Sequence, residues 1–294
     1  MALPRPLTQR QVRGLMMHLP LPVARYLLLL QEYKRLPHLA NPVTFNEKIN
    51  YRIVHDRRPM LAMASSKVAS KEYVAGLGTG VHVPTTYWNG VDLREIDGMT
   101  VPTSWVLKAS HRSRRLVHGE AGTIDVGALD VDVDEWLVDR EYLDDRLWGY
   151  REARKELLLE ERVGSPEEFP DDLKFFVFDG RVEMIQVDHG RRGAHTRNLY
   201  SADWTPLRWN YTRPTGPVQP APANLDRLLD AAGRIGAGWD FVRVDLYNLT
   251  DQIVFGEMTA YPGAGVSPWP YELDRFIGGK WTLPGRSVLA GPAA

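Results

Sequence analysis

The sequence of 294 residues contains no cysteine. This absence excludes disulfides, thiolate catalysis and cysteine-ligated zinc, although it does not indicate a cellular compartment. The chain also lacks an excess of charge of one sign, since 36 basic and 37 acidic residues give a formal net charge of −1. Without a global basic field, the composition does not predict a nucleic-acid partner.

A long uninterrupted apolar run is absent as well. The apolar residues between positions 15 and 30 are interrupted by His18, two prolines and Arg25, and no small-x-small cleavage site follows them. The remaining run at residues 26–30 is too short to span a bilayer. We therefore expect an amphipathic helix at residues 23–36, and a cytoplasmic protein without a membrane span.

Hydrophobic residues make up 44% of the chain, enough for one large domain or two to three small lobes. Thr44 and Glu47 form a capping-box pattern at the start of a further helix. Periodicity and turn residues predict helices at 65–77, 132–150 and 225–235, and strands at 81–88, 104–110, 157–163, 173–178 and 182–187. This interspersed pattern indicates an α+β class with α/β-type lobes and a largely antiparallel main sheet. The Gly/Pro/Ala-rich end after residue 284 is expected to be frayed.

The most informative segment is a hairpin at residues 241–259. Alternation along the strand places Arg243 and Asp245 on one face. If the hairpin is centred on a turn at 248–251, Glu257 lies opposite Arg243 and diagonal to Asp245, at roughly 7–8 Å. Two carboxylates this close repel unless a cation or proton lies between them, and oxygen ligands favour Mg²⁺. The alternative interpretation is a sheet with one solvated face.

Five short segments follow one another along the chain: TFNEKI at 44–49, WVLK at 105–108, DLKFFVFDG at 172–180, RVDLY at 243–247 and FGEMT at 255–259. Segments similar to these occur in the same order in the TupA-like ATP-grasp proteins, and the resemblance extends from about residue 20 to about residue 284. The resemblance implies the ATP-grasp fold, in which the nucleotide is held between a lid lobe and a C-terminal lobe with an antiparallel sheet. It implies an N-terminal lobe at 1–100, a lid at 101–159 and a catalytic lobe at 160–294.

The activity that the resemblance implies is ATP-dependent ligation. A carboxylate accepts the γ-phosphoryl group, and an amine then displaces phosphate from the acyl phosphate. Both substrates are expected to be small molecules, and ATP and Mg²⁺ are the implied cofactors. Members of the family are associated with cell-envelope polymer and polysaccharide gene sets, and secondary-metabolite biosynthesis is a further possible context.

The family motifs assign roles to residues of the hairpin by resemblance. Asp245 and Glu257 match the two acidic Mg²⁺ ligands. Thr259 lies where many ATP-grasp enzymes have a ligating asparagine, and as a hydroxyl it is a weaker ligand. Arg243 matches the catalytic arginine, which stabilises charge on the transferred phosphoryl group or on the tetrahedral intermediate.

The implied ATP-binding residues lie earlier in the chain. Lys108 matches the strand lysine that contacts the phosphates of ATP, and Lys67 is similar to a first-lobe lysine that reaches the same phosphates. Both suit phosphate as point charges. The remaining residues are expected at the adenine hinge, on the nucleotide-facing strand and in the lid loop: Glu160, Glu161, Val163, Lys174 and Ser113. At the hinge the peptide groups, rather than the side chains, are expected to contact the base.

The lid loop departs from the family pattern. Members usually have a His-Gly-Ser-Gly-Gly loop after the strand lysine, whereas residues 111–115 here read HRSRR. A glycine-rich loop brings its backbone N–H groups to phosphates. Either the arginine side chains replace that contact, or nucleotide handling has decayed.

Two further groups are candidates for substrate binding. One is a basic stretch that suits an acidic donor or the γ-phosphate: His189, Arg191, Arg192, His195 and Arg197. Gly263 and Gly265 belong to a Pro-Gly-x-Gly loop that could offer N–H groups to an anion.

Two other functions stay open from the sequence. One is a kinase that phosphorylates a small molecule or glycan without condensation, and the other is a degenerate ATP-grasp module that binds a ligand or regulates a partner. The identity of the acid and amine, the pathway and the oligomeric state do not follow from the residues.

Overall fold

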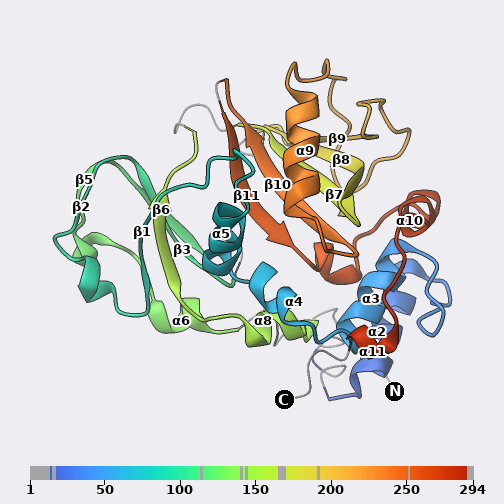
Figure 1. Cartoon of the computed structure of the whole chain (residues 1–294). Coiled ribbons are helices and arrows are strands. Elements are labelled where there is room, and N and C mark those ends of the chain that lie inside the picture. Colours follow the sequence, from blue (N-terminus) through green and yellow to red (C-terminus); the bar gives the residue numbers. More distant parts are fainter. Residues whose placement is uncertain are drawn as a thin grey trace, which may run out of the picture.

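Two antiparallel sheets form the framework of the protein in the computed structural model, which describes residues 14, 18–112, 115–139, 142, 145–164, 170–190, 193–250 and 252–289 (Figure 1). The larger sheet has the order β11-β10-β7-β8-β9. Its strands are β7 (Asp172–Phe178), β8 (Arg181–His189), β9 (Thr196–Tyr200), β10 (Val242–Asn248) and β11 (Ile253–Thr259).

The smaller sheet has the order β1-β6-β3-β4. Its strands are β1 (Thr86–Gly90), β3 (Trp105–Ala109), β4 (Leu116–Gly119) and β6 (Leu157–Glu161), and a ribbon of β2 (Thr100–Val101) and β5 (Gly122–Thr123) adjoins it. This sheet has its own apolar core, which includes Leu107, Ile124 and Trp136. Because β1 pairs with β6, the sheet starts before the predicted lobe boundary at residue 100. The three-lobe division as a whole stays a prediction.

Helices cover the larger sheet and join it to the smaller one. Helix α9 (Leu225–Ile235) packs on β7, β8 and β10, and α5 (Lys67–Gly76) lies between the two sheets (Figure 1). The other helices are α2 (Leu21–Tyr33), α3 (Phe45–His55), α4 (Pro59–Ala64), α6 (Val133–Leu137), α8 (Trp148–Glu152), α10 (Tyr271–Gly278) and α11 (Arg286–Leu289), with 3₁₀ turns η1 (Leu93–Ile96), η2 (Val126–Ala128) and η3 (Pro262–Gly265). No helix in the described ranges is long and apolar enough to cross a bilayer.

Local signals place the N-termini of two helices correctly. Thr44 Oγ1 accepts from the Glu47 N–H, and the Glu47 carboxylate accepts from the Thr44 N–H at 3.0 Å, so the predicted capping box before α3 is confirmed. Ser66 caps α5 by accepting from the Ala69 N–H at 3.2 Å. The second cap fixes the start of the helix that carries Lys67.

The structure contradicts the prediction of one continuous helix and the prediction of one frayed segment. The helix expected at 132–150 is interrupted, because Val138 is extended at the end of α6 and Arg146 has a left-handed φ of 56° before α8. Part of the end expected to fray after residue 284 forms α11, where Leu289 is buried and its carbonyl accepts from the Arg57 N–H at 2.7 Å. Residues 290–294 lie outside the described residues. In both cases tertiary contacts override the local preference.

The two faces of the larger sheet differ in chemistry. Val177, Val244 and other apolar side chains on one face pack with α9, whereas Asp172, Lys174 and Asp245 lie on the other face, since directly paired residues share a face. An aromatic cluster closes one end of the core, where Phe45 of α3 stacks on Trp269 with ring centroids 4.8 Å apart. The apolar packing leaves the polar face free to form a site.

Candidate functional site

A cleft of about 660 Å³ lies at the polar face, with walls from both sheets and from α5. Most of the residues predicted to bind ATP or metal line it: Lys67, Lys108, Glu160, Glu161, Val163, Lys174, Asp245 and Glu257. These residues are spread over about 190 positions of the chain, from Lys67 to Glu257, so the fold alone brings them together. A second cavity of about 460 Å³, around Leu173 and Trp204, is lined by His189 but by none of the residues predicted to bind ATP or metal.

The register of the β10–β11 hairpin differs from the prediction. Glu257 lies directly opposite Asp245, and Arg243 lies opposite Thr259. The pairing is shifted by two residues from the predicted one. The first residue of the shift arises because Asn248 pairs with Ile253 and thus belongs to β10 rather than to the turn. The second arises from a bulge at Gly256, after the Leu246–Phe255 pair. The face assignment of Asp245 and Glu257 is therefore correct, but the carboxylates are direct cross-strand neighbours instead of diagonal ones.

Oxygen atoms of the three predicted metal ligands converge on one point. The Nη2 atom of Arg243 donates to Asp245 Oδ2 at 2.7 Å, to Glu257 Oε1 at 3.0 Å and to Thr259 Oγ1 at 2.9 Å. A single cationic nitrogen thus occupies the place where these three oxygen atoms meet. Mg²⁺ prefers oxygen ligands, so the residue set fits a small hard cation. Within the described residues no group of three or more His, Asp or Glu side chains has metal-binding geometry, which limits the set to two carboxylates and one hydroxyl.

The two carboxylates differ strongly in environment. Asp245 is 2% exposed and also accepts from Lys174 Nζ at 2.6 Å, whereas the Glu257 side chain is 42% exposed. Burial alone would raise the pKa of Asp245, but the charges of Arg243 and Lys174 lower it below its ordinary value. Asp245 is therefore a charged group held by two cations, and Glu257 is the carboxylate that faces solvent.

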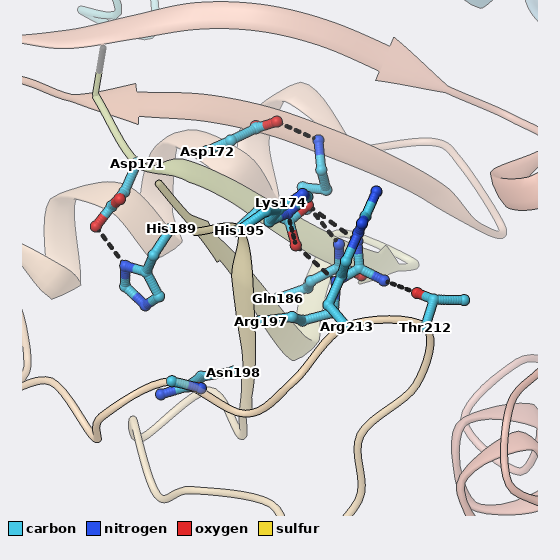
Figure 2. A network of polar contacts seen from close by, with 12 residues as sticks. Asp171, Asp172, Lys174, Gln186, His189, His195, Arg197, Asn198, Thr212 and Arg213 are labelled. Atoms are coloured by element: carbon cyan, nitrogen blue, oxygen red, sulfur yellow. Dashed lines mark hydrogen bonds and ion pairs between the residues drawn. The ribbon is translucent and has the colours of Figure 1, made fainter. Parts of the chain in front are cut away.

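Lys174 bridges two carboxylates rather than extending freely into the cleft. Its Nζ lies 2.6 Å from Asp172 Oδ2 and 2.6 Å from Asp245 Oδ2, and Figure 2 shows the contact with Asp172. Burial lowers the pKa of Lys174, but these two carboxylates raise it more. Contact with the nucleotide stays a prediction for this residue, and its observed partners are acidic side chains.

On the opposite wall, Glu160 lies between two lysines. Its carboxylate pairs with Lys108 through Oε1 and with Lys71 Nζ at 2.5 Å through Oε2. Burial raises the pKa of Glu160, but the lysines lower it more. Lys71 was not predicted from the sequence, although its position four residues after Lys67 on one helix face could have indicated it.

The predicted hinge follows this carboxylate. The Glu161 side chain accepts from the Thr85 N–H at 3.0 Å, and the Glu161 N–H donates to the Thr85 carbonyl at 2.9 Å. Among the described residues, the Val163 peptide group forms no backbone hydrogen bond. A peptide group at the cleft wall that has no backbone partner among the described residues is compatible with recognition of a base, which stays a prediction.

The loop that departs from the family pattern is held by side chains. Lys67 Nζ donates to the Ser110 carbonyl at 3.1 Å and to the Arg112 carbonyl at 2.6 Å. Arg115 Nη2 lies 3.0 Å from Glu135 Oε1, and Arg112 also contacts Glu135. Arg112 and Arg115 both line the cleft, so guanidinium groups stand where the family has glycines. Ser113 lies outside the described residues.

None of the predicted substrate residues that the structure describes lines the cleft. Arg197 pairs with Asp188 at 2.6 Å, its guanidinium lies 4.6 Å from the centre of the Tyr211 ring, and His195 Nε2 is 3.4 Å from Asp188. Figure 2 shows Arg197 next to Lys174 and Gln186, with the His189–Asp171 pair apart from them. Arg191 and Arg192 lie outside the described residues.

The two predicted glycines pack elsewhere. Gly265 is buried against α3, where its carbonyl accepts from Asn50 Nδ2 at 2.7 Å, and a Cβ atom there would lie 2.8 Å from Ile49 Cγ2. Gly263 has a φ of 57° and faces Ser267. Neither lines the cleft, so their role as substrate contacts stays a prediction that the geometry does not support.

Comparison with known proteins gives three findings. The sequence model of the family described as TupA-like ATPgrasp matches residues 47–282. Similar solved structures include D-alanine–D-alanine ligase from Bacillus anthracis complexed with ATP (15% identity, 68% of this chain and 55% of that one, TM-score 0.37). A second is the ATP-grasp ligase PsnB complexed with a precursor variant, Mg and ADP (14% identity, 76% of this chain and 61% of that one, TM-score 0.37). A third is PurK, an N5-carboxyaminoimidazole ribonucleotide synthetase, as its ADP complex (13% identity, 73% of this chain and 47% of that one, TM-score 0.39). The chain spans about half to three fifths of the length of these structures. No curated protein sequence matches it.

Proposed function

Because this chain belongs to the TupA-like ATP-grasp family, whose model matches most of its length, we propose that it is an ATP- and Mg²⁺-dependent ligase that joins a carboxylate to an amine. The observation that carries the proposal is the convergence of Asp245, Glu257 and Thr259 oxygens on one cation position at the wall of the cleft. Lysine charges stand on the opposite wall of the same cleft. Acids that hold a metal and lysines that hold phosphates are the two parts that phosphoryl transfer requires.

The residues of the cleft divide into two roles. Lys108, with Arg112 and Arg115 beside it, supplies positive charge for the phosphates of ATP, and the peptide groups near Val163 contact adenine. Asp245, Glu257 and Thr259 would hold Mg²⁺, which when bound neutralises charge on the phosphates. Arg243 must leave its present partners for that to occur, and its guanidinium is then available to the phosphoryl group that is transferred.

The proposed reaction has two steps. An oxygen of the substrate carboxylate attacks the γ-phosphorus, the bond to the β,γ-bridging oxygen breaks, and ADP leaves. The amine nitrogen then attacks the carbonyl carbon of the acyl phosphate, the C–O bond to phosphate breaks, and the nitrogen loses a proton. Arg197 lies on the same sheet face, on β9, and His195 is near the same Asp188 carboxylate. Both are the proposed contacts for an acidic substrate. A cell-envelope polymer or a secondary metabolite is the proposed product.

Release of ADP and phosphate tests this function. We expect both products to appear only when carboxylate, amine and Mg·ATP are all present, because the second step consumes the acyl phosphate made in the first. Screening pairs of acids and amines, with products identified by mass spectrometry, measures this directly. A stable phosphorylated product without condensation would instead identify a kinase.

Thermal unfolding with Mg·ATP separates an enzyme from a degenerate module. At 100 times the dissociation constant, a nucleotide adds about 2.7 kcal/mol to the free energy of unfolding. An unchanged melting temperature at millimolar Mg·ATP would contradict the proposed function.

A further inference from the structure

Lys71 is a buried charge next to the cleft that the proposed mechanism does not use. It lies on α5, is 6% exposed and places Nζ 2.5 Å from Glu160 Oε2. Lys108, on β3, reaches the other oxygen of the same carboxylate, and its side chain is 19% exposed. Lys108 lines the cleft, and Lys71 is not among the lining residues.

The charges of Lys71, Glu160 and Lys108 do not cancel, because two lysines and one carboxylate leave one positive charge. The two lysines also differ in their access to the cleft. Lys71 is buried against Glu160 and does not line the cleft, so Lys108 is the lysine of the pair that an anion in the cleft would meet. The uncompensated charge is therefore presented at Lys108. Without Lys71, Glu160 and Lys108 would form a neutral pair, and an approaching phosphate would compete with Glu160 for Lys108.

The enclosure of Lys71 is costly unless its partner is charged. Burial lowers the pKa of Lys71, and the neighbouring Glu160 opposes that shift. A buried lysine needs a carboxylate partner, but Glu160 already has a cationic partner in Lys108. A second lysine on the same carboxylate therefore acts chiefly by weakening the hold of Glu160 on Lys108.

We propose that Lys71 is a positioning residue, which neutralises Glu160 so that Lys108 keeps its charge for the phosphate groups of the nucleotide. This inference rests on the proposed function, because it assumes that a nucleotide occupies the cleft. It assigns to the Glu160 side chain a role separate from that of its peptide group at the hinge. It predicts that Lys71 acts on anionic ligands only, and only through Glu160 and Lys108.

The test is binding of ADP and of adenosine, with Mg²⁺ in excess, measured by titration calorimetry. Lys71→Met should weaken ADP binding about tenfold, the scale of one charge-assisted contact, and leave adenosine binding unchanged. Lys71→Arg should keep most of the ADP affinity, since the charge remains. The double variant Lys71→Met with Glu160→Gln should recover ADP affinity, because Lys108 again has no competing carboxylate.

The matched control is Lys48→Met. Lys48 is another partly buried helix lysine, and it donates to the carbonyls of Gly278 and Trp281, away from the cleft. Its replacement should lower the melting temperature without changing the ratio of ADP to adenosine affinity.

Three results would overturn the inference: wild-type ADP affinity in Lys71→Met, equal loss of ADP and adenosine binding in that variant, or no recovery in the double variant. The last would mean that Lys71 itself touches phosphate or only supports the fold. A wild-type protein that binds neither ligand would instead contradict the proposed function.

Discussion

Replacement of Glu257 by glutamine is expected to lower ATP turnover by about 10³-fold without loss of the fold. The amide removes a negative oxygen from the cation position and with it several kcal/mol of charge stabilisation in the transition state. Because the Glu257 side chain is 42% exposed and contacts Arg243 at the edge of the network, the free energy of unfolding should change by less than about 1 kcal/mol. ADP release and chemical denaturation measure the two effects separately.

The control for this variant is Glu272→Gln, which changes an exposed carboxylate on α10 outside the cleft. It should leave both turnover and stability unchanged. A Glu257→Gln protein that turns over ATP at the wild-type rate would refute the assignment of the metal ligands. The proposed ligase would then need a different cation site.

Replacement of Asp245 by alanine is expected to have a different outcome, because this carboxylate is 2% exposed and compensates two buried cations. Removing one partner of a buried ion pair leaves uncompensated charge and destabilises a fold by roughly 3–5 kcal/mol. We expect about 3 kcal/mol, since Lys174 keeps Asp172 and Arg243 keeps Glu257. Urea denaturation of the variant and the wild type gives the difference.

The pH dependence of that difference provides a second measurement. The pKa of Asp245 in the folded protein lies below its ordinary value of 3.8, since the pull of Arg243 and Lys174 exceeds the opposing effect of burial. A lowered folded-state pKa means that the stabilisation is complete above about pH 4 and is lost as the pH falls through the folded-state pKa. The gap between wild type and Asp245→Ala should therefore be constant near neutral pH and shrink below pH 4. A loss of stability at pH 7 that is as small for Asp245→Ala as for Glu257→Gln would contradict the buried-network interpretation.

The contrast between these two acids shows how far sequence reasoning extends. Strand alternation predicts that Asp245 and Glu257 share a face, because side chains alternate with a period of two whatever surrounds the strand. Their direct pairing depends on the bulge at Gly256, and a bulge arises from how two strands fit against each other and their neighbours. The burial of Asp245 depends on β7, whose Lys174 is 71 positions away.

The smaller errors have the same origin. The helix predicted at 132–150 has an amphipathic pattern, but α6 ends at Leu137, and the separate helix α8, which begins at Trp148, packs on α4. The C-terminal segment has a composition typical of disorder, yet Leu289 is buried and its backbone carbonyl accepts from Arg57. Local composition carries no information about such partners.

Local pattern was enough to predict the α+β class, most strands of the two sheets, the capping box of α3 and a family whose ordered motifs supplied the candidate metal and phosphate ligands. Those features depend on neighbours within a few positions, so the order of residues specifies them directly. The three-dimensional structure was needed for the cation point shared by Asp245, Glu257 and Thr259, for the arginines tied to Glu135, and for Lys71 behind Glu160. These are pairings between distant segments, and electrostatic partners depend on distance in space rather than on separation along the chain.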